Sequence, residues 1–153
     1  MPVEIRISQK GTNFAALKRN AEQLSQKALA VGVLPTAGKD KDTGADLIDI
    51  ATWNEYGTSR IPQRPFMRTA EKQNGEQWLS LAEGVAEKII EGKFAEEQGL
   101  EIIGNRMVGD IQKVIGDRSL LAPNAPSTIK RKGSDAPLID SGNLRQSISF
   151  EVR

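Results

Sequence analysis

Apolar and polar residues alternate in two short stretches, one near each end of the sequence. Residues 3–8 read Val-Glu-Ile-Arg-Ile-Ser, and residues 148–153 read Ile-Ser-Phe-Glu-Val-Arg. This period of two predicts half-buried strands. A continuous apolar run at 29–34, closed by Pro35, predicts a further strand that pairs with the strand at 3–8. The strand at 148–153 can complete the same small sheet.

Helical spacing governs the stretches between these strands. Apolar residues from Phe14 to Ala28 recur every three or four positions, which predicts an amphipathic helix capped by Thr12 or Asn13. The sequence therefore begins with a strand and a helix, followed by the strand at 29–34.

Three more helices follow. A short one is predicted between Asp46, which could cap it, and Gly57, which would end it. Pro65 suits the first position of a long helix that extends to about residue 91. Another helix is predicted over 97–116. Two long helices joined by a few residues should pack as an antiparallel pair, so the fold class is α+β: a small mixed or antiparallel sheet packed against the N-terminal helix and this pair.

Two segments are rich in turn-forming and polar residues. Residues 36–45 contain two glycines and an alternating run of lysine and aspartate, and residues 117–136 contain two prolines and one glycine. Neither carries enough apolar surface to order itself, so both are predicted to be mobile loops in the free subunit. Within and after the second, Pro126 could begin a single helical turn, and Asp140 or Ser141 could cap a turn over 142–146.

Length, charge and missing residue types limit the possible functions. The chain has 153 residues, which suits one domain over 1–153. It has 21 Lys and Arg against 20 Asp and Glu, a net charge of +1, so no broad basic field draws it to nucleic acid. Cysteine and histidine are both absent, which removes disulfides, thiolate nucleophiles and the usual general base. The sequence shows neither a signal peptide nor a membrane span, and we expect a soluble protein assembled in the host cytoplasm.

Candidate catalytic and metal sites are weak. Asp40, Asp42 and Asp46 begin like a calcium loop, but its twelfth position is Ala51 where a glutamate is required. Ser127 precedes Lys130 at the spacing of some acyl enzymes, without a second motif of that chemistry. Glutamates on the long helices suit a solvated face. We therefore predict no enzyme activity, no metal and no cofactor.

Two basic clusters could contact a partner. Arg60, Arg64 and Arg68 lie on and beside a connector that is predicted to be exposed, and residues 130–132 read Lys-Arg-Lys. Either cluster could hold phosphate, but arginine also suits interface carboxylates, and no aromatic platform for bases accompanies them. The near-neutral total charge favours a protein interface or plain solvation.

Two motif blocks carry a family resemblance. The first is Asn54-Glu55-Tyr56-Gly57-Thr58 followed by Ile61-Pro62-Gln63-Arg64-Pro65-Phe66-Met67-Arg68, and the second is Pro126, Thr128, Lys130 and Lys132 followed by Pro137-Leu138-Ile139-Asp140-Ser141-Gly142-Asn143-Leu144-Arg145-Gln146-Ser147-Ile148. In this order the blocks resemble the tail-completion and head-tail joining proteins of tailed bacteriophages. Virion-morphogenesis proteins of Mu-like and P2-like phages and minor tail proteins of the Z type share parts of both.

The resemblance implies a structural virion protein of the tail or neck. Such a subunit would form a ring, expected to be a hexamer, around the DNA channel, and would contact the tail tube or tail terminator and the head connector. The residues expected to shape loops or interfaces are Asn54, Glu55, Tyr56, Gly57, Arg60, Pro62, Arg64, Pro65, Phe66, Arg68, Leu138, Asp140, Ser141, Gly142, Leu144 and Ser147. Both blocks could equally serve the fold alone, since turn residues serve packing as readily as binding. The alternative function is a small nucleic-acid-binding accessory protein that uses the two basic clusters.

Overall fold

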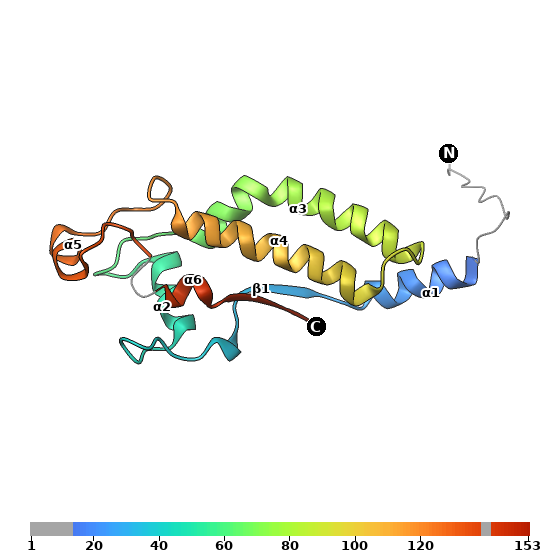
Figure 1. The fold of residues 1–153 in the computed structure, drawn as a ribbon, viewed down its shortest axis with the longest axis horizontal. Coiled ribbons are helices and arrows are strands. Elements are labelled where there is room, and N and C mark those ends of the chain that lie inside the picture. Colours follow the sequence, from blue (N-terminus) through green and yellow to red (C-terminus); the bar gives the residue numbers. More distant parts are fainter. Residues whose placement is uncertain (1–13, 139–141) are drawn as a thin grey trace.

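A computed structural model describes residues 14–138 and 142–153. The predicted strand at 3–8, the caps at Thr12 and Asn13, and the turn residues Asp140 and Ser141 lie outside the described residues. The molecule is elongated, with two long helices side by side, a narrow sheet along one of them and the short helices gathered at one end (Figure 1). In chain order the elements are α1 (Phe14–Ser25), β1 (Leu29–Val33), the 3₁₀ turn η1 (Pro35–Ala37), α2 (Leu47–Tyr56), α3 (Phe66–Ile90), α4 (Glu96–Gly116), α5 (Pro126–Lys132), α6 (Asn143–Gln146) and β2 (Ile148–Val152).

The two described strands form one antiparallel ladder. Leu29 is paired with Val152 at one end and Val33 with Ile148 at the other. The ladder continues for one more pair, because Ala28 and Arg153 exchange backbone hydrogen bonds of 2.7 Å in both directions. The predicted α+β class, with a long antiparallel helix pair packed on a small sheet, is confirmed.

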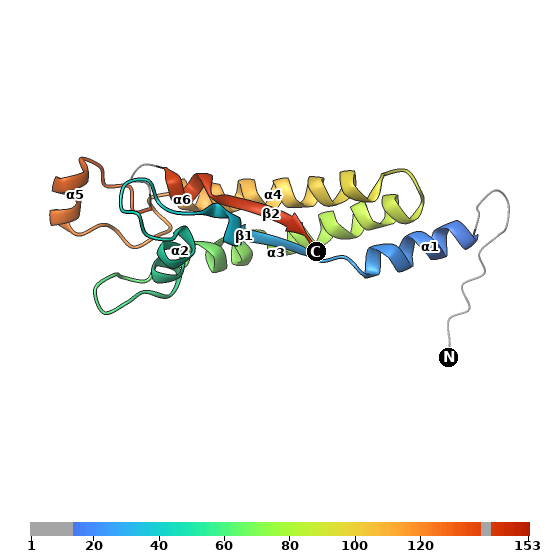
Figure 2. The same cartoon turned by 90° about the horizontal axis from the view of Figure 1, so that it is seen from below.

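Helix α4 packs against the sheet and α3 lies beside α4 (Figure 2). Two glycines of α4 make this close approach possible. A Cβ at Gly104 would come within 2.5 Å of the Phe150 ring of β2, and a Cβ at Gly99 would come within 2.5 Å of Ile89 on α3. The helices therefore meet the sheet and each other at positions where any side chain would have to displace a neighbour.

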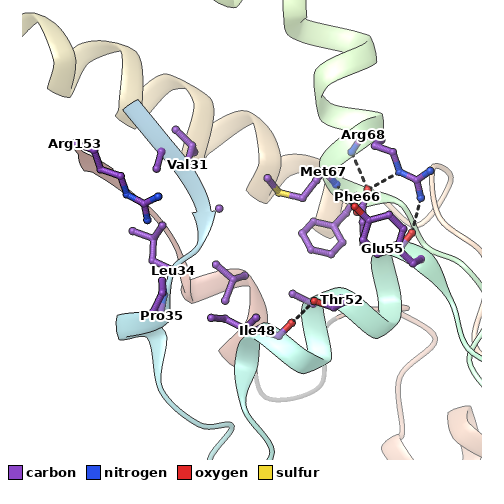
Figure 3. A pocket seen from close by; sticks show the side chains of 15 residues that line it. Val31, Leu34, Pro35, Ile48, Thr52, Glu55, Phe66, Met67, Arg68 and Arg153 are labelled. Atoms are coloured by element: carbon purple, nitrogen blue, oxygen red, sulfur yellow. Dashed lines mark hydrogen bonds and ion pairs between the residues drawn. The ribbon is translucent and has the colours of Figure 1, made fainter. Parts of the chain in front are cut away.

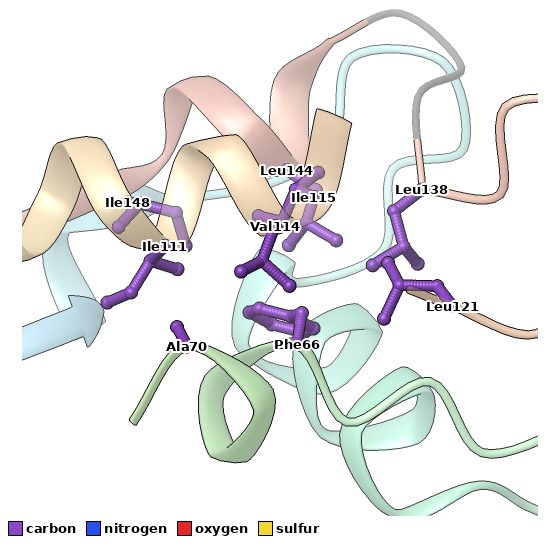
Figure 4. Packing of buried hydrophobic residues seen from close by; sticks show 9 residues of the cluster. All are labelled: Phe66, Ala70, Ile111, Val114, Ile115, Leu121, Leu138, Leu144 and Ile148. Atoms are coloured by element: carbon purple, nitrogen blue, oxygen red, sulfur yellow. The ribbon is translucent and has the colours of Figure 1, made fainter. Parts of the chain in front are cut away.

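The main core joins the ends of the two long helices to the segments that follow α4 (Figure 4). Phe66, at the start of α3, is 1% exposed and anchors the helix as predicted. The other members of the cluster are Ala70, Ile111, Val114, Ile115, Leu121, Leu138, Leu144 and Ile148. A smaller cluster of Val85, Ile89 and Ile103 holds the far end of the pair, where Leu24 of α1 packs against it.

Three details of the predicted helix ends are wrong. Asp46 is the residue before α2, but its side chain makes no capping hydrogen bond. Pro65 precedes α3 instead of occupying its first turn, and its carbonyl accepts the Thr69 N–H at 2.9 Å. Helix α1 ends at Ser25, three residues before the predicted Ala28, because Ala28 already belongs to the ladder with Arg153.

The segment at 36–45 has more local order than its composition suggests. It turns back on itself through hydrogen bonds from the Asp40 N–H to the Ala45 carbonyl at 2.8 Å and from the Leu47 N–H to the Gly38 carbonyl at 3.0 Å. Asp40 also accepts a hydrogen bond of 2.8 Å from the Asn143 side chain on α6. That bond and those from Thr43 hold the pKa of Asp40 below its ordinary value. The mobility of this loop and of 117–136 stays a prediction, which hydrogen exchange on the isolated subunit would test.

Candidate functional site

The first motif block forms a tight corner between α2 and α3. Gly57 ends α2 at φ 75°, and a Cβ there would lie 3.1 Å from the Gln63 backbone nitrogen. The Thr58 N–H donates to the Ile61 carbonyl at 2.9 Å. The Thr58 hydroxyl accepts the N–H groups of Arg60 at 3.2 Å and Ile61 at 3.0 Å. Only glycine fits where the chain reverses direction at position 57, because it has no Cβ. The backbone of the corner is therefore held in one conformation.

Glu55 connects the two helices across this corner. Its carboxylate is buried, with 6% of the residue exposed, and accepts the backbone N–H groups of Met67 at 2.9 Å and Arg68 at 3.2 Å. These are free N–H groups of the first turn of α3, so α2 supplies the anionic cap that α3 lacks in its own sequence. The Arg68 guanidinium pairs with the same carboxylate at 2.9 Å and donates to the Glu55 carbonyl at 2.7 Å (Figure 3).

Arg64 binds the first block to a segment almost sixty residues further along. Its Nε donates to the Ala122 carbonyl at 2.7 Å, and its Nη2 donates to the Pro123 carbonyl at 3.0 Å and to the Asn124 side-chain oxygen at 3.2 Å. A fourth contact, from Nη1 at 3.3 Å, reaches the Asn54 side chain. Burial lowers the pKa of Arg64 from its usual value, yet a guanidinium remains charged at neutral pH.

The predicted cluster of three exposed arginines is therefore wrong. Arg64 is 6% exposed, and the guanidinium faces inward because three carbonyl-type oxygens of a proline-containing segment need donors. The Arg68 side chain is 50% exposed and is paired with Glu55. Arg60 is exposed.

Arg60 lies instead beside the second basic cluster. A cavity of about 520 Å³ is lined by Arg60, Arg131, Lys132 and Thr128, with Pro62 at its edge. Helix α5 supplies three of these residues, and the connector before α3 supplies the other two. Arg64 lines the same cavity, so the structure brings two residues of the first basic cluster together with two of the second.

The described residues of the second block contribute two leucines to the core. Leu138 and Leu144 are each 7% exposed, so both leucines point into the core, as expected for Leu144. Gly142 precedes α6 at φ 79°, a conformation that favours glycine. The Ser147 hydroxyl donates to the Leu144 carbonyl at 2.7 Å and helps to end α6 before β2 begins.

Several large side chains on α2 are exposed beside the corner between α2 and α3. Tyr56 is 67% exposed, and the Arg68 guanidinium lies 5.1 Å from the centre of its ring. Trp53 is 42% exposed on the same helix. Aromatic and arginine side chains of this kind are enriched at protein interfaces.

The sequence analysis did not identify Asp110, a buried carboxylate in the middle of α4. It is 3% exposed and accepts the Trp78 indole N–H from α3 at 2.9 Å. Arg106 binds the same oxygen at 2.8 Å and Lys113 the other at 3.3 Å. Burial alone would raise the pKa of Asp110, but these three hydrogen bonds outweigh it and hold the pKa below its ordinary value. The spacing of Arg106 and Asp110, four residues apart, was the available sequence clue.

The described residues contain no group of three or more acidic, histidine or cysteine side chains placed to hold a metal ion. Within the same ranges, no helix has the length and apolar character needed to cross a bilayer. Ser127 is exposed on the first turn of α5. Comparisons of the chain with protein-family models, curated proteins and solved structures give no match.

Proposed function

We propose that this chain is a structural subunit of a tailed-phage virion that completes the tail or joins it to the head as a ring around the DNA channel. The observation that supports it most is the Arg64 contact. It binds the corner formed by the first motif block to residues 122–124, which lead into the second block. Two sequence blocks that resemble the same protein class are thus parts of one stiff end of the molecule.

The surface of that end is suited to contact with other proteins. The corner is held from within by Glu55 and Arg64, so its exposed side chains are presented on a fixed backbone. Tyr56 and Trp53 offer aromatic surface, and Arg60 offers an exposed cation. A prearranged surface loses little conformational entropy on binding, which favours assembly of many identical subunits.

Deletion and complementation in the phage that encodes the chain would test this function. Without the subunit, we expect tails and filled heads that do not join, or tails of abnormal length, seen by electron microscopy. The wild-type chain supplied in trans should restore infectious particles. Tyr56→Ala and Trp53→Ala together should fold normally and fail to restore them, whereas Leu79→Ala, an exposed apolar residue on α3, should restore them. Finished and infectious particles without the subunit would contradict the proposal.

The cavity between Arg60, Arg131 and Lys132 favours one alternative, binding of a nucleic-acid backbone. These three residues and Arg64, which also lines the cavity, come from two segments that are far apart in sequence, a convergence that the total charge of +1 does not predict. Cations held around one hollow are a common arrangement for binding phosphate.

A salt titration separates the two functions. If the cavity binds DNA, the affinity should fall as salt rises, with a slope of about −2 to −3 on logarithmic axes for three phosphate contacts. Arg60→Gln and Arg131→Gln should each reduce the slope by about 1. Absence of binding at low salt would leave the structural function as the better account.

A further inference from the structure

The cavity beside Arg60, the basic cavity, is suited to an anion. Among the described residues that line it, Arg60, Arg64, Arg131 and Lys132 are basic and none is acidic. Arg64 is buried and already donates to the carbonyls at 122 and 123, whereas Arg60 and Arg131 are exposed. Two exposed guanidinium groups at one hollow attract a carboxylate or a phosphate.

A row of glutamates, the α3 row, lies toward the other end of the molecule. Glu83, Glu87 and Glu91 are exposed and follow at intervals of four residues, so they occupy one face of the helix. Like charges at this spacing destabilise a helix, and carboxylates near its C-terminus also oppose the helix dipole. Among the described residues the row makes one ion pair, between Glu91 and Lys93 at 2.6 Å. The described part of the subunit therefore leaves the charges of Glu83 and Glu87 unbalanced.

Neighbouring acidic residues have partners or positions that explain them. Glu96 and Glu97 lie in the first turn of α4, where the helix dipole favours carboxylates, and Glu96 pairs with Lys27 at 3.6 Å. Helix α1 packs against α3, but its Lys18 pairs with its own Glu22 at 3.8 Å. The α3 row has no comparable explanation within the described chain, which favours a partner outside the subunit.

The basic cavity and the α3 row cannot meet within one subunit. Arg64, in the wall of the cavity, lies just before α3, and Glu83 is about 25 Å further along that helix at about 1.5 Å per residue. Figure 1 shows α5 at one end of the molecule and the end of α3, beside α1, toward the other. Because the rigid helix α3 separates the two surfaces, a contact between them requires two copies of the chain.

We propose that the basic cavity receives the α3 row of a second copy, so that the carboxylates of Glu83 and Glu87 pair with Arg60 and Arg131. The planar guanidinium group of arginine matches a carboxylate with two parallel hydrogen bonds. The contact joins two different surfaces, and a repeated head-to-tail contact of this kind forms a ring when the rotation between subunits closes. The inference rests on the proposed function only in taking the second copy to be a neighbour in the ring.

A nucleic acid fits these two surfaces less well than a second copy does. Its phosphates would pair with Arg60 and Arg131, but the α3 row would stay unbalanced. A chain with a net charge of +1 also provides little long-range attraction for a polyanion. A second copy balances the cations of one subunit and the carboxylates of the next in a single contact.

Two charge-reversed proteins test the contact. Glu83→Lys with Glu87→Lys makes both surfaces basic, and Arg60→Glu with Arg131→Glu makes both acidic. All of these positions are exposed, so both full-length proteins should keep at least the wild-type melting temperature. In sedimentation velocity at low salt, we expect wild type to self-associate and each variant to do so at least about tenfold more weakly. An equimolar mixture should regain association, because the unchanged cavity of the first variant meets the unchanged α3 row of the second.

Glu71→Lys with Glu101→Lys is the matched control, because it makes the same change of charge at exposed positions outside the row. It should associate like wild type. Reversed variants that associate as strongly as wild type, or a mixture that stays monomeric, would overturn the proposal. DNA binding that is lost in Arg60→Glu with Arg131→Glu, without self-association of wild type, would assign the cavity to a nucleic acid and also overturn it.

A covalent trap detects the contact if association is weak, because the chain contains no cysteine of its own. Thr128→Cys, in the lining of the basic cavity, is mixed with Gly84→Cys, next to Glu83, under mild oxidation. We expect a mixed disulfide dimer to form faster than with Gly109→Cys, a site on α4 that is equally open to an added Cβ. Equal rates, or no product, would overturn the proposal.

Complementation separates this contact from the proposed function. If Glu83→Lys with Glu87→Lys restores infectious particles, the contact is wrong and the tail function stands. If mixing the reversed variants restores association but deletion of the gene is harmless, the contact stands and the tail function is wrong.

Discussion

The corner between α2 and α3 and the far half of the α3–α4 pair are stabilised by opposite means. At the corner, buried polar side chains bind backbone groups of other segments: Glu55 binds the start of α3, and Arg64 binds the carbonyls at 122 and 123. In the far half, Val85, Ile89 and Ile103 pack around Gly99, where the helices approach closely. The corner contains short elements that could not order one another by apolar contact alone, whereas the long helices have continuous apolar faces.

This difference indicates that the shape of the corner is more strictly specified than that of the helix pair. Apolar cores tolerate many substitutions of similar volume, while a buried polar network is stable only when all its members are present. Within the described residues, no buried side-chain nitrogen or oxygen lacks a hydrogen-bond partner. Removing one partner at the corner should therefore cost more than removing a similar volume from an exposed face, and the variants below test that difference in order of expected effect.

Arg64→Met should have the largest effect. It leaves two carbonyls and two side-chain oxygens without their donor, and we expect a loss of about 3 kcal/mol in the free energy of unfolding. Arg60→Met, an exposed arginine of the same corner, should change it by less than about 0.5 kcal/mol. Urea denaturation of both variants measures the difference. Equal effects would show that the Arg64 contacts do not hold the corner.

Glu55→Gln should cost less, about 1–2 kcal/mol, because the amide keeps one acceptor for the first turn of α3 but loses the charge that favours a helix N-terminus and pairs with Arg68. Glu71→Gln, an exposed residue one turn further along α3, is the matched control and should be almost neutral. If Glu55→Gln were as stable as wild type, the cap would stabilise α3 through its hydrogen bonds alone, and the charge of Glu55 would contribute nothing.

The same substitution at two glycines of α4 should give opposite signs. Gly104→Ala places a methyl group against the Phe150 ring and should destabilise the protein by about 1–2 kcal/mol. Gly109→Ala meets no atom within 4 Å and should stabilise the helix by up to about 1 kcal/mol, since alanine has the higher helix propensity. Thermal unfolding of the pair checks this. A neutral Gly104→Ala would mean that β2 adjusts its position on α4 easily.

The sequence predicted the long helices better than the corner. The signals for the helices are local, whereas the corner depends on contacts between residues far apart in the chain. The boundaries of α3 and α4 agree with prediction to within one or two residues, because apolar spacing and the flanking Pro65 and Gly116 are local features. The strands at Leu29–Val33 and Ile148–Val152 were also predicted from local features, a short apolar run closed by Pro35 in the first and alternation in the second. The turn at Gly57 was predictable because it depends on one local feature, a residue without a Cβ.

The buried role of Arg64 was not predictable in this way. Its partners lie 58 to 60 residues away, and nothing in the neighbourhood of Arg64 indicates that carbonyls at 122 and 123 will face it. An arginine between two prolines was assigned to solvent, as most arginines are. Asp110 was missed for a related reason, because its Trp78 partner lies on another helix.

The smallest predicted effect concerns Asp110, the main polar link between the two long helices among the described residues. The pKa of Asp110 in the folded protein lies below its value in the unfolded chain, which is about 3.9. Its contribution to stability is therefore fully present above about pH 4 and is lost as the pH falls through the lower, folded-state pKa. Asp110→Asn cannot titrate, so its free energy of unfolding should fall less between pH 5 and pH 2 than that of wild type. Asp49→Asn, an exposed aspartate of α2, serves as the control and should follow the wild-type curve. Superimposable acid profiles for wild type and Asp110→Asn would show that the bonds from Trp78, Arg106 and Lys113 do not favour the ionised carboxylate, and the link between α3 and α4 at this point would then not depend on the charge of Asp110.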